Sequence, residues 1–451
     1  MNYTKLTQTT RYLLYAFFAA NIAIMTGFWW QGSGVEMLRS GSGLLRGIGR
    51  VTGLYAAFAM IVDFALIARV PVVEQTLGRI WQLKLHKWFG NAAFYLVFAH
   101  IIFLVIGYAL PFHFSFVHEF LDFTFNYPDV LQAVVATVLL VAVVVLSVSF
   151  VIRRVKYETW YFVHLLSYLV ILLGFAHQLS TGVDFVGRPV FVAYWYALYI
   201  ALIVIVVGFR FVRPLWISFR HDLRVDRVES ETPHTYSIYL RGRNLDRLKY
   251  KGGQFAIWRF MDSKRWWQGH PFSYSSLPGQ SRLRLTYKKS GDFTNHLDQV
   301  KPGTRVLMDG AYGIFTAERA IKPKLLLIAG GIGVTPFISL LPDAIGLNKD
   351  IVMLYAVRTS QDLAFRRELE ASGIKLTFIV SNQPDYEGET GVIGIHKLKH
   401  LVPDASDREV FLCGPPAMMK TVETALVSVG VPTKLIHTED FTFNRSARRS
   451  G

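Results

Sequence analysis

Four histidines lie in apolar stretches of the chain, where an ionisable side chain is unusual. His86 and His100 belong to one stretch, and His164 and His177 belong to another. Because ionisable groups are costly inside a bilayer, we interpret them first as functional residues. Imidazole nitrogens can bind haem iron or another metal ion, or relay protons. A lone histidine could be a packing residue, but two pairs on two helices are harder to explain in that way.

The spacing of the histidines predicts two levels of paired side chains. The first two are 14 residues apart and the last two are 13 apart, which is about 20 Å of helical rise in each case. His86 would therefore face His164, and the other two would face each other at the second level. Thirteen residues of ideal helix turn two imidazoles more than about 90° apart. We expect either an irregularity in that helix, with Gly174 as the candidate, or haems that lean differently. Geometry alone leaves open haem binding, a proton relay and metal transport.

The elements that must position these histidines are membrane helices. A span needs about 20 mostly apolar residues. Six segments qualify, at roughly 12–30, 48–68, 86–109, 130–152, 160–179 and 190–212. The first has no small-residue cleavage signature, so we expect a retained helix and not a removed signal peptide.

The charges of the connecting segments predict the orientation. One set of connections is basic and the opposite set is acidic. The basic set contains Lys5, Arg11, Arg69, Arg79, Lys84, Lys87, Arg153, Arg154 and Lys156, and the acidic set contains Glu36, Glu119, Asp122, Asp129 and Asp184. By the positive-inside rule the N-terminus is cytoplasmic, and six spans return the chain to the cytoplasm. We predict an integral protein of the inner (plasma) membrane.

The same clustering explains the formal net charge of +16. No recognisable nucleic-acid module accompanies it, so we expect contact with membrane lipid and no binding of nucleic acid. The single cysteine, Cys413, excludes a disulfide framework within the chain and a CxxC metal site.

Short alternating strands begin at about Phe219 and predict a small antiparallel β-barrel. Thr235–Leu240 and Gly253–Phe260 alternate as half-buried strands do. In His270–Ser276, hydroxyl groups could hydrogen-bond the edge of a flavin and an aromatic ring could cover apolar surface; the plain alternative is a barrel strand after a turn. In Lys289–Asn295, a glycine, a hydroxyl group and a helix start could bind a pyrophosphate.

The last third of the chain predicts an α/β domain that binds a nucleotide. The apolar strand Lys324–Ala329 leads into a glycine-rich turn, Gly330–Pro336. Glycines let the backbone approach a phosphate, and the following helix directs its positive end toward it. Arg358, at the end of a further strand, could contact the 2′-phosphate of NADPH; otherwise it is a solvated loop charge.

Together these motifs resemble the family of NADPH oxidases and ferric reductases, in the family's order and over about residues 48–444. The histidine pairs are similar to its haem ligands, so the resemblance implies two b-type haems. It also implies FAD at the His-Pro-Phe-Ser motif and NADPH or NADH at the glycine-rich turn, where Pro336 departs from GxGxxG as the family does. Phe441, in a C-terminal Glu-x-aromatic pattern, would cover the flavin, with Phe443 as the alternative.

The resemblance assigns residues to each cofactor. The haem ligands are His86, His100, His164 and His177. The FAD residues are His270, Pro271, Phe272, Ser273, Tyr274, Ser275, Gly291, Phe293, Thr294 and Phe441. The NAD(P) residues are Gly330, Gly331, Gly333, Thr335, Pro336, Arg358, Cys413, Gly414 and Pro415. Phe441, Cys413 and Arg50 are expected to act in catalysis.

The implied activity is transfer of electrons from cytosolic NAD(P)H, through FAD and two haems, to an acceptor on the far side. Oxygen, reduced to superoxide, is the first expectation, and a ferric or cupric chelate is the alternative. Arg46 and Arg50 could assist an anionic product or contact haem propionates, whereas family oxidases carry a histidine where this chain has Leu104. A non-enzyme alternative is a proton or metal transporter with a redox-sensing domain. No obligatory protein partner is evident.

We therefore predict a multi-domain fold. Its parts are a six-span transmembrane haem domain (1–214), an antiparallel β-barrel FAD domain (215–320), an α/β nucleotide-binding domain of the ferredoxin-NADP reductase type (321–444) and a disordered tail (445–451).

Overall fold

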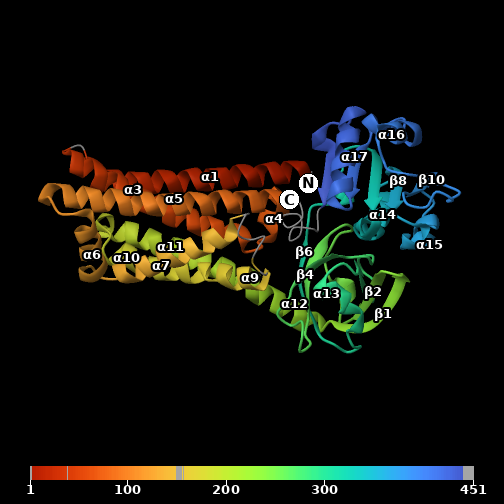
Figure 1. Cartoon of the computed structure of the whole chain (residues 1–451), viewed down its shortest axis with the longest axis horizontal. Helices are drawn as coiled ribbons and strands as arrows, with labels where there is room; N and C mark the ends of the chain where they lie inside the picture. The colour runs from red at the N-terminus through yellow and green to blue at the C-terminus, as the bar shows by residue number, and fades with distance from the viewer. Residues whose placement is uncertain (1–2, 38, 149–154, 156, 440–451) are drawn as a thin grey trace. The chain divides into compact units, whose positions relative to one another are not determined.

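The computed structural model describes residues 3–37, 39–148, 155 and 157–439. Lys5–Arg210 form one compact unit, and the chain from Phe211 onward belongs to a second. The first unit is helical and the second mixes helices with sheets (Figure 1).

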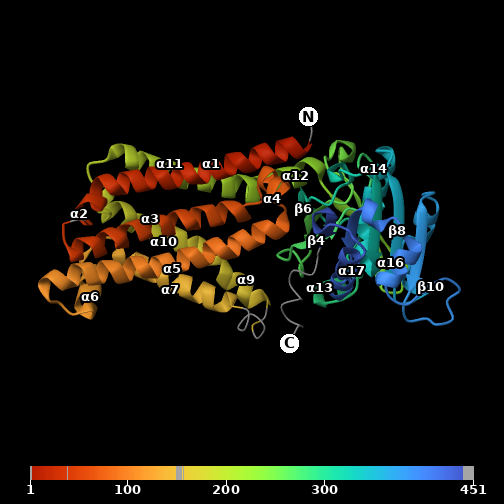
Figure 2. The same cartoon turned by 90° about the horizontal axis from the view of Figure 1, so that it is seen from above.

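The helical unit contains long helices joined by short ones. They are α1 (Tyr3–Trp29), η1 (Trp30–Gly34), α2 (Val35–Met37), α3 (Gly41–Ile67), α4 (Pro71–Leu77), α5 (Arg79–Phe112), α6 (Phe116–Asn126), α7 (Val130–Ser147), α9 (Tyr157–Leu165), α10 (Ser167–Ser180), η2 (Val183–Phe185) and α11 (Pro189–Val207). Figure 2 shows the long helices lying roughly side by side.

Within the described part of the chain, six helical stretches are long and apolar enough to cross a membrane. They are Gln8–Gly34, Gly41–Ile67, Trp81–Phe112, Val130–Ser147, Thr159–Ser180 and Pro189–His221. The six expected spans are therefore confirmed, although several helices continue beyond the apolar segment that predicted them.

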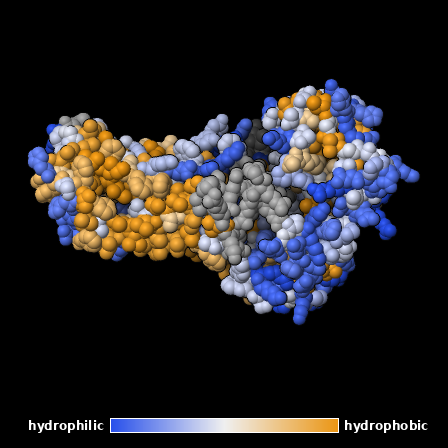
Figure 3. Space-filling model, in the orientation of Figure 1, coloured by the Kyte–Doolittle hydropathy of each residue, from blue (hydrophilic) through white to orange (hydrophobic). Residues whose placement is uncertain are grey.

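The surface of this unit is suited to lipid. Figure 3 shows hydrophobic residues over most of its visible face, and large side chains such as Val138 and Leu172 are exposed. Inside, Phe58, Phe191 and Trp195 are buried in one apolar cluster. Helices in a membrane associate closely where small residues face each other. In α3 the buried Gly49 permits such an approach to α5, because a Cβ there would lie only 3.0 Å from the Leu104 backbone nitrogen.

The second unit begins with α12 (Arg213–His221), so the expected start of the strands at Phe219 is wrong by a few residues; the strands begin at Arg224. Two antiparallel sheets follow. One is β1 (Arg224–Thr232), β2 (Thr235–Arg241) and β5 (Leu283–Lys288), and the other is β4 (His270–Ser273), β3 (Phe255–Phe260) and β6 (Val306–Tyr312). Isolated bridges at Arg224–Arg305 and Tyr274–Leu285 join the sheets at both edges. The six strands thus follow one another around a small barrel-like core, as expected.

The rest of this unit is a parallel sheet covered by helices. Its strands lie in the order β10 (Glu389–Thr390), β9 (Lys375–Val380), β8 (Asp350–Val357), β7 (Lys324–Gly330), β11 (Glu409–Cys413) and β12 (Ile436–Glu439). The main helices are α14 (Thr335–Gly346), α15 (Arg366–Glu370), α16 (Ile395–Leu401) and α17 (Pro416–Ser428).

Alternate residues of β7 enter different cores, because successive side chains of a strand point to opposite faces. Leu325 and Leu327 pack with the residues of α14, and Leu326 and Ile328 pack with those of α17. The strand order reverses between β7 and β11, and ligands of such sheets bind at the carboxyl ends of the strands at this point. The α/β nucleotide-binding architecture is confirmed.

Candidate functional site

The four membrane histidines form two facing pairs. The ring centres of His86 and His164 are 5.9 Å apart, and those of His100 and His177 are 6.4 Å apart. Two metal–nitrogen bonds of about 2 Å, plus the offset of each ring centre, place two axial imidazoles about 6 Å apart. The spacing of both pairs therefore fits a metal held between two histidines, which is the arrangement of a bis-histidine haem.

The pairing depends on a local irregularity, and its position differs from the one expected. Gly174 lies inside the continuous helix α10, so the expectation that it supplies the irregularity is wrong. The break is at Leu166, between α9 and α10, where the backbone N–H donates to the carbonyl of Val163 at 3.0 Å. This i to i−3 bond winds the chain more tightly than an α-helix. The added rotation brings His164 and His177 toward the same side.

The two histidines of α5 form hydrogen bonds with different acceptor groups. His86 Nδ1 lies 2.7 Å from Oδ1 of Asp63. His100 Nδ1 lies 2.7 Å from the carbonyl oxygen of Gly49. In each case the bond leaves Nε2 as the nitrogen that can bind a metal, because metal-bound histidines usually donate their other N–H to a neighbour.

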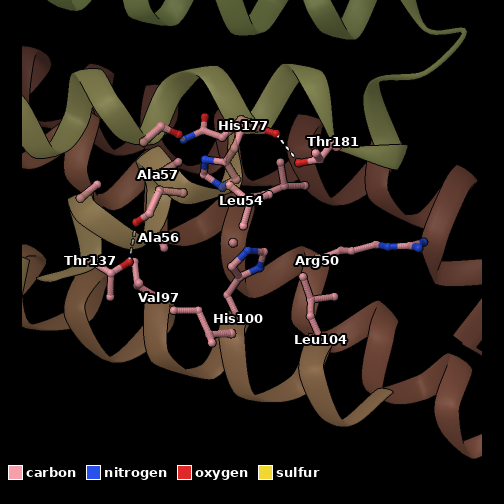
Figure 4. Close-up of a pocket in the computed structure, with 18 of the residues that line it drawn as sticks. Arg50, Leu54, Ala56, Ala57, Val97, His100, Leu104, Thr137, His177 and Thr181 are labelled. Carbon is pink, nitrogen blue, oxygen red and sulfur yellow. Dashed lines mark hydrogen bonds between the residues drawn. The ribbon is translucent and has the colours of Figure 1, made fainter. Parts of the chain in front are cut away.

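A cavity of about 290 Å³ adjoins His100 and His177. Figure 4 shows that these two side chains point toward each other, while Arg50 extends away from them along the cavity. The lining is mostly apolar and comes from several helices, and it includes Leu104 and Tyr108. A flat apolar group with a polar edge could occupy such a space.

Arg50 is held in place at this cavity by a chain of hydrogen bonds. It donates to the Ser33 hydroxyl at 2.8 Å and to the Tyr108 hydroxyl at 2.7 Å. Ser33 in turn donates to Asp184 at 2.7 Å. Arg46 lies nearby, with its guanidinium carbon 5.1 Å from the centre of the Tyr108 ring. The pair of His100 and His177 therefore has cationic side chains close to its cavity.

Several residues of this site were missed at the level of sequence: Asp63, Gly49, Gly53, Ser33, Tyr108 and Asp184. Asp63 could have been found, because it is the one acidic residue in the segment predicted at 48–68 and a carboxylate in a membrane helix is a functional candidate. The others act through backbone atoms or common side chains, for which the sequence carries no signal.

In the barrel, His270, Phe272 and Phe293 form an aromatic group, with the first and last stacked at 3.7 Å between ring centres. Burial, with a contribution from nearby Arg259, lowers the pKa of His270 to about 4, so it is neutral at pH 7. The hydroxyl of Ser273 is buried and has no hydrogen-bond partner within the described residues. Because buried polar groups are normally paired, this hydroxyl fits a contact with a flavin.

The other residues predicted for FAD have different surroundings. Tyr274 is buried inside the barrel, stacks on Tyr250 at 4.0 Å and donates its hydroxyl to the Met308 sulfur. Ser275 donates to the carbonyl oxygen of Arg284. These two side chains therefore hold the strand in place and do not point away from the core.

The remaining three lie at β4 and α13 (Asp292–Asn295). Pro271 is exposed on its strand. Gly291 immediately precedes the helix, and Thr294 accepts from the Ser290 N–H and donates to the Gly291 carbonyl oxygen. This tight turn leads into the short helix α13, so the helix start predicted in Lys289–Asn295 is present.

The glycine-rich turn after β7 packs closely on the turn after β11. A Cβ at Gly330 would lie 2.3 Å from the Met418 sulfur, and a Cβ at Gly333 would lie 2.3 Å from the Cys413 carbonyl oxygen. Gly414 lies against Gly330 in the same way, at 3.0 Å. Gly331 has φ = 51°, the left-handed conformation that favours glycine. These glycines are needed because two loops meet at the reversal point of the sheet.

Thr335 and Pro336 form the first turn of α14, and Thr335 donates to the Ile332 carbonyl oxygen at 3.0 Å. Pro415 caps the start of α17. The sheet thus directs two helix starts toward the same edge, where an anionic phosphate is favoured.

Arg358 follows β8 with an exposed side chain, while its carbonyl oxygen accepts from the Asn382 N–H at 2.8 Å. Its backbone is therefore fixed and its charge faces solvent. Cys413 is buried in the core beneath the glycine turn. Phe441 and Phe443 lie outside the described residues.

Three family models match the chain. Residues 52–175 match the ferric reductase like transmembrane component, residues 227–316 match an FAD-binding domain, and residues 327–424 match an oxidoreductase NAD-binding domain. The three matches follow one another in the order of the units described above.

Curated relatives match the second half of the chain. NADH oxidoreductase HCR of Escherichia coli is 30% identical over 240 residues, which are 51% of this chain and 70% of the relative. The glycine betaine monooxygenase reductase subunit of Chromohalobacter salexigens is 28% identical over 50% of this chain, and an NADPH oxidoreductase of Mycobacterium tuberculosis is 27% identical over 52%. The chain spans 65% and 63% of the length of the latter two, less than two thirds of each.

Solved structures also resemble this half. A ferredoxin NADP+ reductase from Neisseria gonorrhoeae, with bound FAD and NADP, has a TM-score of 0.43 and 20% identity, and the match covers 49% of this chain and 98% of that one.

Proposed function

Because the chain belongs to the superfamily of membrane ferric reductases and NADPH oxidases, we propose that it carries electrons from NAD(P)H across the membrane. The two facing histidine pairs are the observation on which this rests. His86 and His164 would hold an inner haem b, nearer the bundle end where the chain leaves toward the second unit. His100 and His177 would hold an outer one.

The residues of the second unit would bind the cofactors that supply electrons to this pathway. The helix starts at Thr335 and Pro415 would bind the pyrophosphate of NADPH or NADH. The exposed Arg358 would bind the 2′-phosphate that only NADPH carries, so NADH would bind with lower affinity. His270, Phe272 and Ser273 would contact FAD, which when bound accepts a hydride and passes on single electrons. Cys413 would lie beside the nicotinamide, and Phe441 would cover the face of the flavin that the nicotinamide must reach. The dehydrogenase part and the N-terminus would be cytoplasmic, with the helices in the plasma membrane.

We propose oxygen as the acceptor, with NADPH + 2 O₂ giving NADP⁺ + H⁺ + 2 superoxide. Arg50 lines the cavity beside the outer pair and is held by Ser33 and Tyr108. A positive charge in an apolar cavity favours the reduction of a neutral molecule to an anion, since interactions between charges are strong where water is excluded.

The second candidate is reduction of a ferric or cupric chelate. The observation that favours it is Leu104, which lines the cavity where a polar residue would assist oxygen chemistry. Such a reductase needs an accessible outer haem edge and no small polar site.

One experiment distinguishes these acceptors. Purified protein in vesicles would be given NADPH with oxygen or with a ferric chelate, and superoxide would be measured with and without superoxide dismutase. Oxygen-dependent turnover that falls in Arg50→Gln, and less in Arg50→Lys, supports the oxidase. Fast chelate reduction that is insensitive to dismutase and to Arg50→Gln supports the reductase. Purified protein without a Soret band would contradict both, and would favour a transporter.

A further inference from the structure

A buried carboxylate distinguishes the two histidine pairs. Asp63 lies on α3 within an apolar span and is only 8% exposed. The one ion-pair contact that the described residues give it is with His86, at 2.7 Å. At the other pair, the acceptor for His100 is a backbone carbonyl, that of Gly49. His86 thus has a carboxylate as its hydrogen-bond acceptor, whereas His100 has a backbone carbonyl.

A carboxylate in this position costs free energy, because a charge inside a membrane helix is strongly disfavoured. Such a residue is therefore a functional candidate. The hydrogen bond to His86 is the contact that gives the carboxylate a role.

The chemistry of the bond follows from which ring nitrogen is used. A histidine that binds a metal through Nε2 carries its proton on Nδ1. That proton points at Asp63 Oδ1, and the carboxylate makes the ring a stronger electron donor toward the metal. A stronger donor stabilises the oxidised metal over the reduced one. A carbonyl dipole, such as that of Gly49, has a smaller effect than a full charge.

We propose that Asp63 is a positioning residue that lowers the reduction potential of the inner haem relative to the outer haem. This rests on the proposed function, since it requires the two bis-histidine haems. An electron that leaves the inner site for the outer site would then move toward the higher potential, and the one electron lost at the inner site would be the one gained at the outer site. The carboxylate would therefore bias the transfer toward the acceptor side.

The test is a potentiometric titration of both haems in the full-length protein, followed by visible absorbance. Asp63→Asn keeps the size of the side chain and an oxygen that can accept the Nδ1–H, but it removes the charge. Mutating the hydrogen-bond partner of a metal-bound histidine typically changes metal affinity or activity tenfold or more. We expect the electron to favour the inner haem about tenfold more than in the wild type, which is a rise of about 59 mV in its potential. The outer potential should not change.

Two further variants make the outcome decisive. His100→Leu identifies the inner haem as the one that it retains. Asp63→Glu keeps the carboxylate, so its inner potential should lie below that of Asp63→Asn. If Asp63→Asn loses the inner haem and Asp63→Glu keeps it, the carboxylate positions His86, and the proposal then stands only if the wild-type inner haem has the lower potential of the two. Loss of the inner haem from both variants overturns it.

Two haems with unchanged potentials in Asp63→Asn also overturn the proposal, while leaving the proposed function intact. The proposed function fails at an earlier stage, if the wild-type protein binds no haem. The two failures are therefore separate observations.

Discussion

A single methyl group at Gly53 should remove the outer haem. Gly53 lies on α3 against the ring of His100, and an ideal Cβ there would be 2.5 Å from Nδ1 and 2.8 Å from Cε1. Ordinary contact begins near 3.5 Å, so Gly53→Ala must displace the ring by about 1 Å. Metal–ligand bonds tolerate about 0.2 Å. The shift would also stretch the 2.7 Å bond from His100 to Gly49 beyond the range of a hydrogen bond.

Loss of helix stability cannot account for this effect, because alanine favours a helix interior by about 1 kcal/mol over glycine. The assay is the ratio of haem to FAD in purified protein, by the pyridine haemochrome method. We expect it to fall from two to one in Gly53→Ala, with the His86 site retained. The control is Gly27→Ala on α1, where nothing lies within 4 Å of the added methyl group. Two haems and an unchanged spectrum in Gly53→Ala would refute the assignment of His100 as a ligand.

His100→Leu should likewise leave one haem while NADPH still reduces the flavin; two retained haems would show that His100 is not a ligand. Arg358→Ala should raise the KM for NADPH about tenfold, which corresponds to about 1.4 kcal/mol of binding free energy. The KM for NADH should change little, because the exposed guanidinium would contact only the 2′-phosphate. Equal effects on both coenzymes in steady-state kinetics would mean that Arg358 has a purely structural role. Phe441→Ala should weaken FAD binding by at most about tenfold, since an aromatic contact contributes about 0.5–1.5 kcal/mol. It should also prolong the long-wavelength nicotinamide–flavin band in stopped-flow spectra, and the same result in Phe443→Ala alone would show that the wrong aromatic residue was chosen.

Much of the fold could be predicted from local patterns in the sequence. Six apolar stretches predicted six spans, because the thickness of a bilayer fixes the length of a helix that crosses it. The rise of a helix predicted that His86 would meet His164, and their rings do face each other. The turn at Gly330–Gly333 was recognisable because a strand precedes it and a helix follows, and only glycine fits where two loops pack so closely.

What the chain's sequence could not specify is which groups of neighbouring elements form hydrogen bonds with the site residues. Asp63 and His86 are 23 residues apart, Gly49 and His100 are 51 apart, and Ser33 and Asp184 are 151 apart.

Such contacts depend on how helices pack and rotate, and hydropathy does not encode that rotation. The position of the helix irregularity was missed for the same reason. Glycine is a plausible weak point in any helix, yet the turn at Leu166 is tightened where α9 gives way to α10, and nothing about a leucine predicts this. The sequence therefore identified the four histidines that we propose as haem ligands, and it paired them by their levels along the helices. The tertiary structure decided the hydrogen-bond acceptors of His86 and His100, because both are set by the neighbouring helix α3.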